Sequence, residues 1–307
     1  MSGGPLIALV GPTASGKTEA GLVLAEALGA EVVSIDSMLV YRGMDVGTAK
    51  PTAAERARVP HHLMDLIEPS EPFSVAAFQR EARGAIGAIV GRGARAILVG
   101  GSGLYLRAVV DDLEFPGTDP ETRAELERQA STLGAARMYQ RLAALDPVAA
   151  GRIEPRNLRR IVRALEVAAI TGRPFSTFAR SWGRYPAGAV KAAGVRMSRE
   201  VLIERIGRRM DAMLEKGWLD EVRTLVEEGF GGWLTSSQAI GYAELARHLR
   251  GDMTLAEAVE ATLKRTGNLA RRQMAWFRRD PRIHWFDVGA GGAVEAVDLM
   301  SAFLEDA

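Results

Sequence analysis

The segment from Gly11 to Thr18, with the sequence GPTASGKT, carries a complete phosphate-binding motif of the form G-x-x-x-x-G-K-[ST]. In such a loop the glycines let successive backbone N–H groups point at one anion, and the start of the following helix adds partial positive charge. The motif assigns Lys17 as a cation for phosphate oxygens and Thr18 as a hydroxyl ligand for Mg²⁺. We therefore expect a di- or triphosphate to bind through Gly11, Thr13, Ala14, Ser15, Gly16, Lys17 and Thr18.

The residues on both sides of this loop predict the elements that must position it. An apolar run, Leu6–Val10, precedes the loop as a strand, and residues 18–28 follow it as a helix. Two further apolar runs, Glu31–Asp36 and Ala94–Gly100, predict strands, and residues 73–90 predict a helix between them. Alternation of this kind is typical of a parallel sheet with helices on its faces. We predict an α/β fold with a parallel sheet like that of the P-loop NTPases.

Asp36 closes the second predicted strand, and ligands of such sheets bind at the carboxyl ends of the strands. Its carboxylate is therefore expected beside the phosphate loop, either as a helper for Mg²⁺ or as a general base. The strand that ends at Val99 continues into Gly100-Gly101, without the aspartate that phosphate-loop ATPases carry at such a place. This difference disfavours ATP hydrolysis and favours other chemistry on a diphosphate.

The sequence changes character after a proline-containing stretch at residues 114–120. Beyond it we predict helices and no strand, at residues 121–133, 136–145 and 157–171. Amphipathic helices continue after residue 194. We therefore predict three parts: the first part of the phosphate-loop core at residues 1–116, an all-helical insertion at residues 117–194, and C-terminal helices at residues 195–307 that complete the core.

The charge of the chain is unevenly distributed. The net charge is +1, but residues 117–194 hold thirteen Lys or Arg and seven Asp or Glu, a balance of +6, which leaves −5 for the other residues. Within this segment Arg159, Arg160 and Arg163 lie on one predicted helix. A basic helical segment is typical of a contact with nucleic acid, and a solvated helix surface is the alternative.

The composition sets limits on the class of protein. The chain has no cysteine, which excludes disulfides, thiolate zinc sites and cysteine nucleophiles. The first apolar run is short and leads directly into the phosphate loop, so we expect no secretory signal, and no run approaches the length of a membrane span. We expect a cytoplasmic monomer without membrane contact.

Several motifs together resemble those of the tRNA dimethylallyltransferases, also called tRNA isopentenyltransferases, of the bacterial type. The most specific is the block Asp36–Pro51, with the sequence DSMLVYRGMDVGTAKP. The matching stretches cover almost the whole chain: residues 11–18, 36–51, 60–65, 73–78, 98–105, 157–167, 171–174, 238–242 and 270–277. The zinc-binding tail of eukaryotic relatives has no counterpart in this cysteine-free sequence.

The resemblance implies transfer of a dimethylallyl group from dimethylallyl diphosphate to N6 of the tRNA adenosine on the 3′ side of the anticodon. It implies that Asp36 is the general base, that the phosphate loop with Mg²⁺ stabilises the diphosphate leaving group, and that Arg205 and Arg209 contribute to that site. The tRNA contacts that it implies are Asp36, Ser37, Met38, Leu39, Ser102, Arg123, Arg159, Arg160 and Arg163. The helical insertion would then hold the anticodon stem.

Three positions depart from the family pattern. Leu39 stands where Gln is common, Ser102 where Thr is common, and Gly267 where Arg is frequent. The first change would remove a polar contact to the base, the second keeps the hydroxyl, and the third would remove a diphosphate contact. The alternatives are a prenyltransferase for free adenine nucleotides, a phosphate-loop kinase and a non-catalytic RNA-binding module. The basic insertion favours tRNA as the acceptor, and the phosphate loop with Asp36 favours an enzyme.

Overall fold

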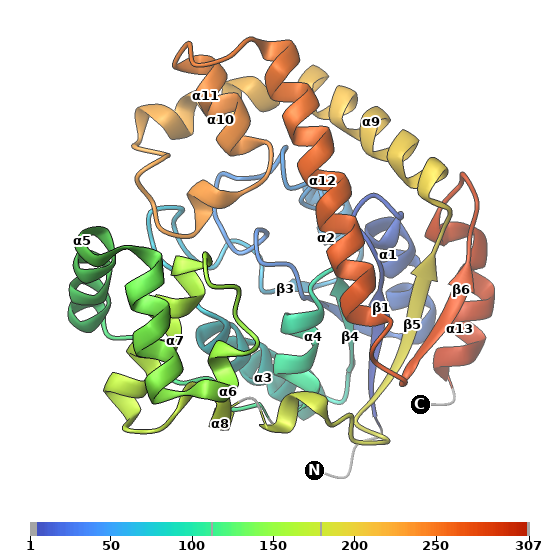
Figure 1. Cartoon of the computed structure of the whole chain (residues 1–307). Helices are drawn as coiled ribbons and strands as arrows, with labels where there is room; N and C mark the ends of the chain where they lie inside the picture. Colours follow the sequence, from blue (N-terminus) through green and yellow to red (C-terminus); the bar gives the residue numbers. More distant parts are fainter. Residues whose placement is uncertain (1–4, 112, 179, 306–307) are drawn as a thin grey trace. The chain divides into compact units, whose positions relative to one another are not determined.

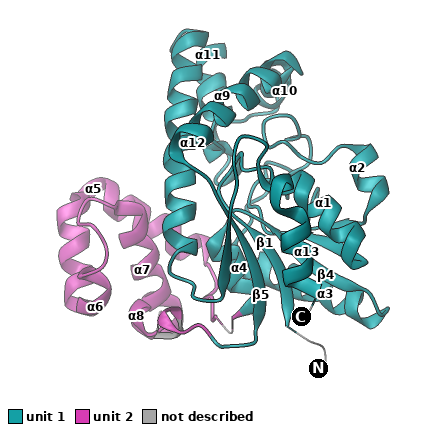
Figure 2. Cartoon of the chain, turned by 90° about the vertical axis from the view of Figure 1, so that its right-hand side faces the viewer, with its two compact units in different colours: residues 1–110, 186–307 teal, residues 111–185 magenta. Residues whose placement is uncertain are grey.

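The computed structural model describes residues 5–111, 113–178 and 180–305. The chain divides into two compact units, which are residues 1–110 with 186–307, and residues 111–185 (Figure 2). The first contains the strands and the phosphate loop, and the second is helical. We call them the sheet unit and the helical unit.

The sheet unit is built, in its described part, on six parallel strands in the order β3-β2-β4-β1-β5-β6 (Figure 1). The strands are β1 (Leu6–Val10), β2 (Ala30–Ser34), β3 (His61–His62), β4 (Arg95–Gly100), β5 (Val190–Arg196) and β6 (Ile283–Asp287). In the central register Leu9 lies beside Val99 on one side and Ala193 on the other. Because all strands run the same way, the loops after β1, β2 and β4 meet at one edge of the sheet.

The described helices of the sheet unit are α1 (Lys17–Leu28), α2 (Ala53–Arg58), α3 (Val75–Gly91), α4 (Gly103–Val110), α9 (Arg199–Glu215), α10 (Trp218–Glu227), α11 (Tyr242–Leu249), α12 (Leu255–Phe277) and α13 (Val297–Glu305). Of these, α1, α3 and α13 pack against strands of the sheet, as the alternation of strands and helices predicts, whereas α9, α10, α11 and α12 pack with one another. α1 and α13 share a buried cluster with Ile7 and Leu9 of β1. Ala8 and Val10, which point to the opposite face, are fully buried as well. The predicted α/β fold with a parallel sheet is therefore confirmed.

A second buried cluster joins the segment after β2 to the C-terminal helices. Val40, Tyr41 and Met44 pack there with Trp218 of α10 and Tyr242 of α11. The apolar residues between positions 38 and 46 thus anchor this segment against α10 and α11. This packing places the segment that follows Asp36 at the carboxyl edge of the sheet.

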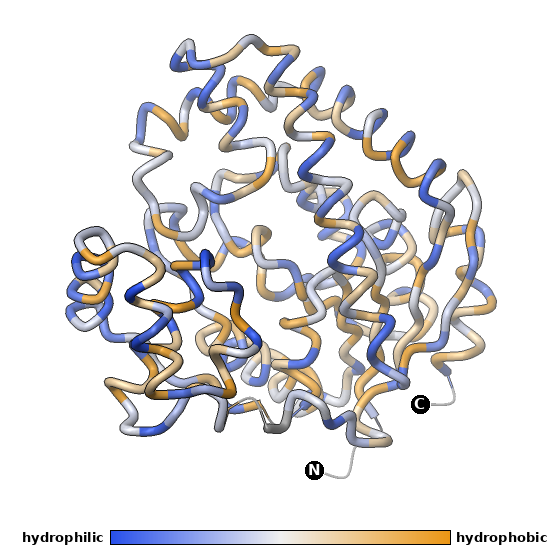
Figure 3. The backbone as a smooth tube through the Cα atoms, in the orientation of Figure 1, coloured by the Kyte–Doolittle hydropathy of each residue, from blue (hydrophilic) through white to orange (hydrophobic). Residues whose placement is uncertain are grey.

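α9 supplies the amphipathic surface that its sequence predicts. Ile206, Met210 and Met213 are buried, at the spacing of one helix face. In Figure 3 both α9 and α12 alternate between hydrophilic and hydrophobic residues along their length. Among the described residues, no helix is long and apolar enough to cross a membrane.

The prediction of no strand between residues 117 and 194 was wrong, and the boundary of the insertion shifts with it. Residues 190–194 form most of β5, which pairs with β1, and the helical unit is residues 111–185. The strand reads VKAAGVR, and its Ala and Gly residues have weak strand propensity. Gly194 is required by packing, because a Cβ there would lie 2.4 Å from Ile283. The strand is therefore difficult to predict from the sequence, because most of its buried residues are small.

The helical unit contains the predicted helices as α5 (Pro120–Leu145) and α7 (Leu158–Thr171). It also contains two short helices that the sequence did not predict, α6 (Pro147–Ala150) and α8 (Phe175–Phe178). α5 is broken at Gly134, whose φ is 76°, which agrees with two predicted helices that flank this position. Asn157 caps α7 by accepting a hydrogen bond from the backbone N–H of Arg160. With the observed boundaries the unit holds twelve Lys or Arg and ten Asp or Glu, so its charge balance is +2 and not the +6 of the predicted segment.

A buried carboxylate organises the helical unit. Glu166 of α7 is fully buried and accepts hydrogen bonds from Arg123 at 2.6 Å, Arg163 at 2.9 Å and the backbone N–H of Asp119 at 3.2 Å. Arg163 also donates to the carbonyls of Pro116 and Gly117. These bonds tie the entry segment of the unit to α5 and α7.

We expect Glu166→Ala to destabilise the helical unit by about 3 kcal/mol. The substitution leaves Arg123 and Arg163 without their carboxylate partner. Both arginine side chains are partly exposed to water, which limits the loss of stability. Hydrogen exchange at the amides of α5 and α7 measures this change. Glu154→Ala, at an exposed position of the same unit, is the control. A loss below about 1 kcal/mol in Glu166→Ala would contradict the assigned role.

Candidate active site

The predicted phosphate loop has the geometry that its motif requires. It links β1 to α1, with Gly16 at φ 85° and Ala14 at φ 62°. Ser15 closes the loop by donating its hydroxyl to the carbonyl of Pro12 at 2.8 Å. Gly16 precedes α1 and has no side chain to cap it, so the first N–H groups of the helix face outward for an anion.

Lys17 brings a buried cation to this loop. Its Nζ donates to the carbonyl of Pro12 at 2.5 Å and to Ser15 Oγ at 3.4 Å. Burial and, to a lesser extent, the positive charge of Arg209 lower the pKa of Lys17, the carboxylate of Asp36 opposes both, and the result is a pKa of about 7. A bound anion would favour the charged form of Lys17.

Two arginines of α9 approach the same loop. Arg205 donates its Nε to the carbonyl of Ala14 at 2.8 Å, and Arg209 donates to the carbonyl of Thr48 at 3.4 Å. The two residues are four apart, so they share one side of the helix. Burial lowers the pKa of the Arg209 guanidinium, and Asp36 opposes this shift. The structure therefore brings both predicted arginines to the phosphate loop.

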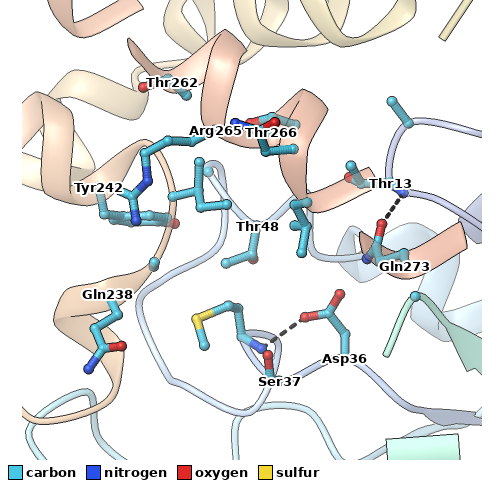
Figure 4. Close-up of a pocket in the computed structure, with 18 of the residues that line it drawn as sticks. Thr13, Asp36, Ser37, Thr48, Gln238, Tyr242, Thr262, Arg265, Thr266 and Gln273 are labelled. Atoms are coloured by element: carbon cyan, nitrogen blue, oxygen red, sulfur yellow. Dashed lines mark hydrogen bonds between the residues drawn. The ribbon is translucent and has the colours of Figure 1, made fainter. Parts of the chain in front are cut away.

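Asp36 lies at the carboxyl end of β2, where the sequence places it. One carboxylate oxygen accepts the backbone N–H of Met38 at 2.8 Å, which fixes the side chain in a local turn. In Figure 4 the carboxylate lies opposite Thr48 and near Gln273, and the other oxygen points away from the Met38 bond. Asp36 is thus held by its own backbone while facing the space in front of the phosphate loop.

Two cavities meet at this point. The first, which we call the aromatic cleft, has a volume of about 780 Å³ and is lined by Trp218, Tyr242 and Trp276 together with polar groups (Figure 4). The polar lining includes Thr13, Asp36, Ser37, Thr48, Ser102, Gln238, Arg265, Asn268, Arg272 and Gln273. Of the predicted tRNA contacts in the sheet unit, Asp36, Ser37, Met38 and Ser102 line this cleft.

The second cavity, which we call the basic cavity, has a volume of about 970 Å³. Its cationic lining is Lys17, Lys50, Arg56, Arg205, Arg208, Arg209 and Lys216. Ala14, Arg209 and Met213 line both cavities, so the two spaces share a wall at the phosphate loop. A smaller space of about 80 Å³, lined by Lys17, Thr18, Asp36 and Leu39 among others, lies at the same place.

Close packing after β4 explains why no second carboxylate follows that strand. A Cβ on Gly100 would lie 2.8 Å from the carbonyl oxygen of Ile35, and one on Gly101 would lie 2.4 Å from Gln273 Nε2. Gln273 of α12 in turn accepts the backbone N–H of Thr13 at 2.8 Å. The Ile35 backbone therefore leaves no space for a side chain at Gly100, and a side chain at Gly101 would displace Gln273 from its bond to the phosphate loop.

Gln273 is a site residue that sequence reasoning missed. It stands within residues 270–277, one of the stretches that carry the family resemblance, and no role was assigned to it there. The missed signal is its place on an amphipathic helix next to Trp276, which packs against Gly103. Only the fold shows that this helix reaches the phosphate loop.

Lys50 has a structural role. The Lys50 ammonium is buried and donates to the carbonyl of Tyr41 at 2.7 Å and to the carboxylate of Asp65 at 2.6 Å, and it also pairs with Asp45. It therefore holds the segment after β2 in shape. His61 and His62 bond to the Val59 carbonyl and to Glu31 respectively.

Comparison with known proteins decides the family. A family model described as IPP transferase matches residues 39–280, and one described as isopentenyl transferase matches residues 5–63. The chain belongs to the IPP transferase family. A tRNA dimethylallyltransferase of Desulforudis audaxviator is 48% identical over 95% of each chain. One of Streptomyces coelicolor is 49% identical over 98% of this chain and 96% of its own.

Solved structures agree with this assignment. A tRNA isopentenylpyrophosphate transferase of Bacillus halodurans shares 41% identity and a TM-score of 0.69, covering 99% of this chain and 98% of its own. A eukaryotic dimethylallyltransferase acting on tRNA shares 26% identity and a TM-score of 0.78, covering 98% of this chain and 77% of its own. The chain is therefore an enzyme of the prenyltransferase class.

The four predicted arginines of the helical unit fall into two groups. Arg159 and Arg160 are exposed at the start of α7. Arg123 and Arg163 are bound to Glu166, so much of their hydrogen-bonding capacity is used inside the unit. Two exposed arginines that lie side by side on a surface can contact the phosphates of a nucleic acid.

The donor set at the phosphate loop fits Mg²⁺ better than a transition metal. Among the described residues, no group of three or more His, Cys, Asp or Glu is placed to hold a metal ion. Mg²⁺ takes oxygen ligands, keeps several waters and commonly binds through substrate phosphates, so the exposed Thr18 hydroxyl and the nearby Asp36 carboxylate are sufficient protein partners.

We expect Lys17→Ala to weaken binding of inorganic pyrophosphate at least about tenfold near pH 6, because the loop loses its buried cation. Binding favours the protonated lysine, so its contribution is full below the pKa of about 7 and declines above it. The affinity ratio of wild type to variant should then fall about tenfold by pH 8. Calorimetric titration at both pH values measures this ratio, with Lys264→Ala, at an exposed position, as control. A ratio that does not change with pH would contradict the assigned pKa.

Proposed function

We propose that this enzyme transfers the dimethylallyl group from dimethylallyl diphosphate to N6 of the adenosine on the 3′ side of the anticodon in tRNA. One observation carries the proposal: a single carboxylate, Asp36, lines the aromatic cleft beside the phosphate loop. This arrangement suits proton abstraction from an acceptor while a diphosphate leaves. The tRNA dimethylallyltransferases that share 48–49% identity with the chain support the same reaction.

In this proposal the basic cavity and phosphate loop hold the diphosphate. The C–O bond of dimethylallyl diphosphate breaks, the N6–C bond forms, and N6 gives its proton to the carboxylate of Asp36. Negative charge grows on the departing diphosphate as the C–O bond breaks. Lys17, Arg205 and Arg209 are placed to neutralise this charge with groups that are already fixed by the fold.

Mg²⁺, held by Thr18 and phosphate oxygens, would supply further positive charge to the leaving group. The Thr18 hydroxyl lies at the start of α1, where the helix N-terminus acts in the same direction. The Asp36 carboxylate lines the same small space as Thr18. The hydrogen bond from Met38 orients its carboxylate toward the acceptor.

The aromatic cleft is suited to an adenine that has left its stack. A base inside the anticodon loop must be extruded to reach an enclosed site, at a cost of about a few kcal/mol. Trp276, which is partly exposed, offers aromatic surface, and Gln238, Arg265 and Arg272 offer polar groups in the lining. We propose that Ser37, Met38, Leu39 and Ser102 contact the tRNA here. Because the acceptor is tRNA, we place the reaction in the cytoplasm.

The direct test of the proposed function is incubation with unmodified tRNA and labelled dimethylallyl diphosphate, with and without Mg²⁺. The expected product is N6-dimethylallyladenosine beside the anticodon, without ATP. Consumption of ATP in step with product would contradict the proposal. Equal transfer to free adenosine monophosphate would contradict the tRNA acceptor.

We expect Asp36→Asn to lower the transfer rate by about two orders of magnitude or more, which is the contribution of a general base. Binding of dimethylallyl diphosphate and tRNA should persist, because the amide keeps the shape of the side chain. Single-turnover kinetics with labelled diphosphate measures the rate. Asp211→Asn, at an exposed position of α9, should react as wild type. A rate in Asp36→Asn within about threefold of wild type would remove this residue as the base.

We expect the double substitution of Arg159 and Arg160 by Ala to weaken tRNA binding and to reduce its salt dependence by about one unit of slope per lost phosphate contact. The control is Ala at Arg152 and Arg156, two exposed arginines of the same unit with the same total charge. Binding titrations at several salt concentrations measure both. An unchanged salt slope in the Arg159 and Arg160 variant, or a slope equal to that of the control variant, would show that this surface is simply solvated.

A further inference from the structure

The carboxylate of Glu221 in α10 is saturated by four hydrogen bonds. One oxygen accepts the backbone N–H groups of Asp45 at 2.8 Å and Val46 at 2.7 Å. The other accepts the backbone N–H of Gly47 at 3.2 Å and the hydroxyl of Tyr242 at 2.5 Å. Three successive backbone N–H groups therefore converge on one side chain, as they would on a bound anion.

The segment held in this way lies between the two cavities. Asp45 and Val46 line the basic cavity, and Gly47 and Thr48 line the aromatic cleft. The carbonyl of Thr48 accepts a hydrogen bond from Arg209, which lines both spaces. Residues 45–48 thus connect the Glu221 carboxylate to a cation of the diphosphate site.

Close packing against Trp218 restricts the position of residues 45–48. A Cβ on Gly47 would lie 1.9 Å from Trp218 Nε1, and a Cβ on Gly241 would lie 2.1 Å from Trp218 Cη2. The indole is therefore enclosed between two glycine backbones, and Tyr242 meets its edge at 5.6 Å between ring centroids. Trp218 sets how closely the segment can approach α10, and Glu221 holds it at that distance.

We propose that Glu221 is a positioning residue for the transfer reaction: it fixes residues 45–48 so that Arg209 and the wall between the two cavities are aligned for transfer. The inference rests on the proposed function. Glu221 itself contacts neither cavity and acts through the backbone of the segment. Loss of the clamp would misplace Arg209 relative to the departing diphosphate while leaving Lys17 and the phosphate loop in place.

The acceptor chemistry of Glu221 makes the proposal testable with an isosteric variant. In Glu221→Gln, the amide NH₂ would face backbone N–H donors, and only one oxygen could accept. The glutamine should therefore fail although it fills the same space. A small misplacement of reacting groups by a substitution away from the chemistry can lower rates by about 10²-fold, so we expect kcat to fall about 10- to 100-fold.

The experiment compares Glu221→Gln, Glu221→Ala and the control Glu227→Gln, an exposed glutamate of the same helix. We expect faster hydrogen exchange at the amides of residues 45–47 in both Glu221 variants and unchanged exchange in α1. Transfer kinetics should show lower kcat with KM for dimethylallyl diphosphate within about threefold of wild type. The control should match wild type in every measurement.

Unchanged exchange at residues 45–47 with kcat within about twofold of wild type in Glu221→Gln would overturn the proposal. A rise in KM for dimethylallyl diphosphate with unchanged kcat would also overturn the proposal, because it would indicate that Glu221 affects substrate binding and not the transfer step. If Glu221→Ala does not fold, Glu221→Gln decides alone. If wild type transfers no dimethylallyl group, the proposed function fails, and the exchange data still decide whether Glu221 holds the segment.

Discussion

A buried cation, Lys17, and a partly buried one, Arg209, are held near one carboxylate, Asp36, at the carboxyl edge of the sheet. Their burial lowers the pKa of both cations, and Asp36 alone opposes this shift. Such a site is electrostatically costly without an anion, and a diphosphate supplies the charge that it lacks. The order of the strands, the start of α1 and the approach of α9 all serve to bring these three groups together. As charge moves to the departing diphosphate, the same cations stabilise it.

A steric constraint separates this site from that of an ATPase. A Cβ on Gly100 would meet the backbone of Ile35, and the Gln273 side chain occupies the space beside Gly101. The place where an ATPase carries its second carboxylate is therefore taken up by Ile35 and Gln273 in this site. With one carboxylate on the acceptor side and cations on the diphosphate side, the site suits attack at carbon. Membership of the IPP transferase family agrees with this chemistry.

The sequence predicts those parts whose signals are local. The phosphate loop, β1 and α7 have strong motifs, caps or periodicity, and the structure confirms them. β5 was missed because its buried residues are small, and this error moved the C-terminal boundary of the insertion and added Lys191 to it. The N-terminal boundary was placed six residues too late, which left out three acidic residues, and the two shifts together account for the change from +2 to +6. Gln273 and Glu221 were missed because their partners lie 260 and about 175 residues away, so that only the fold brings them into contact. Long-range hydrogen bonds leave no periodic signal in a sequence.

The position of bond cleavage tests the account most directly. Dimethylallyl diphosphate carrying oxygen-18 in the bridge between carbon and phosphorus is incubated with the enzyme and unmodified tRNA, and the products are analysed by mass spectrometry. Attack at carbon predicts that all of the label appears in pyrophosphate while the dimethylallyl group is on N6 of adenosine. Label in dimethylallyl alcohol, with a phosphorylated acceptor, would show cleavage at phosphorus and contradict the account.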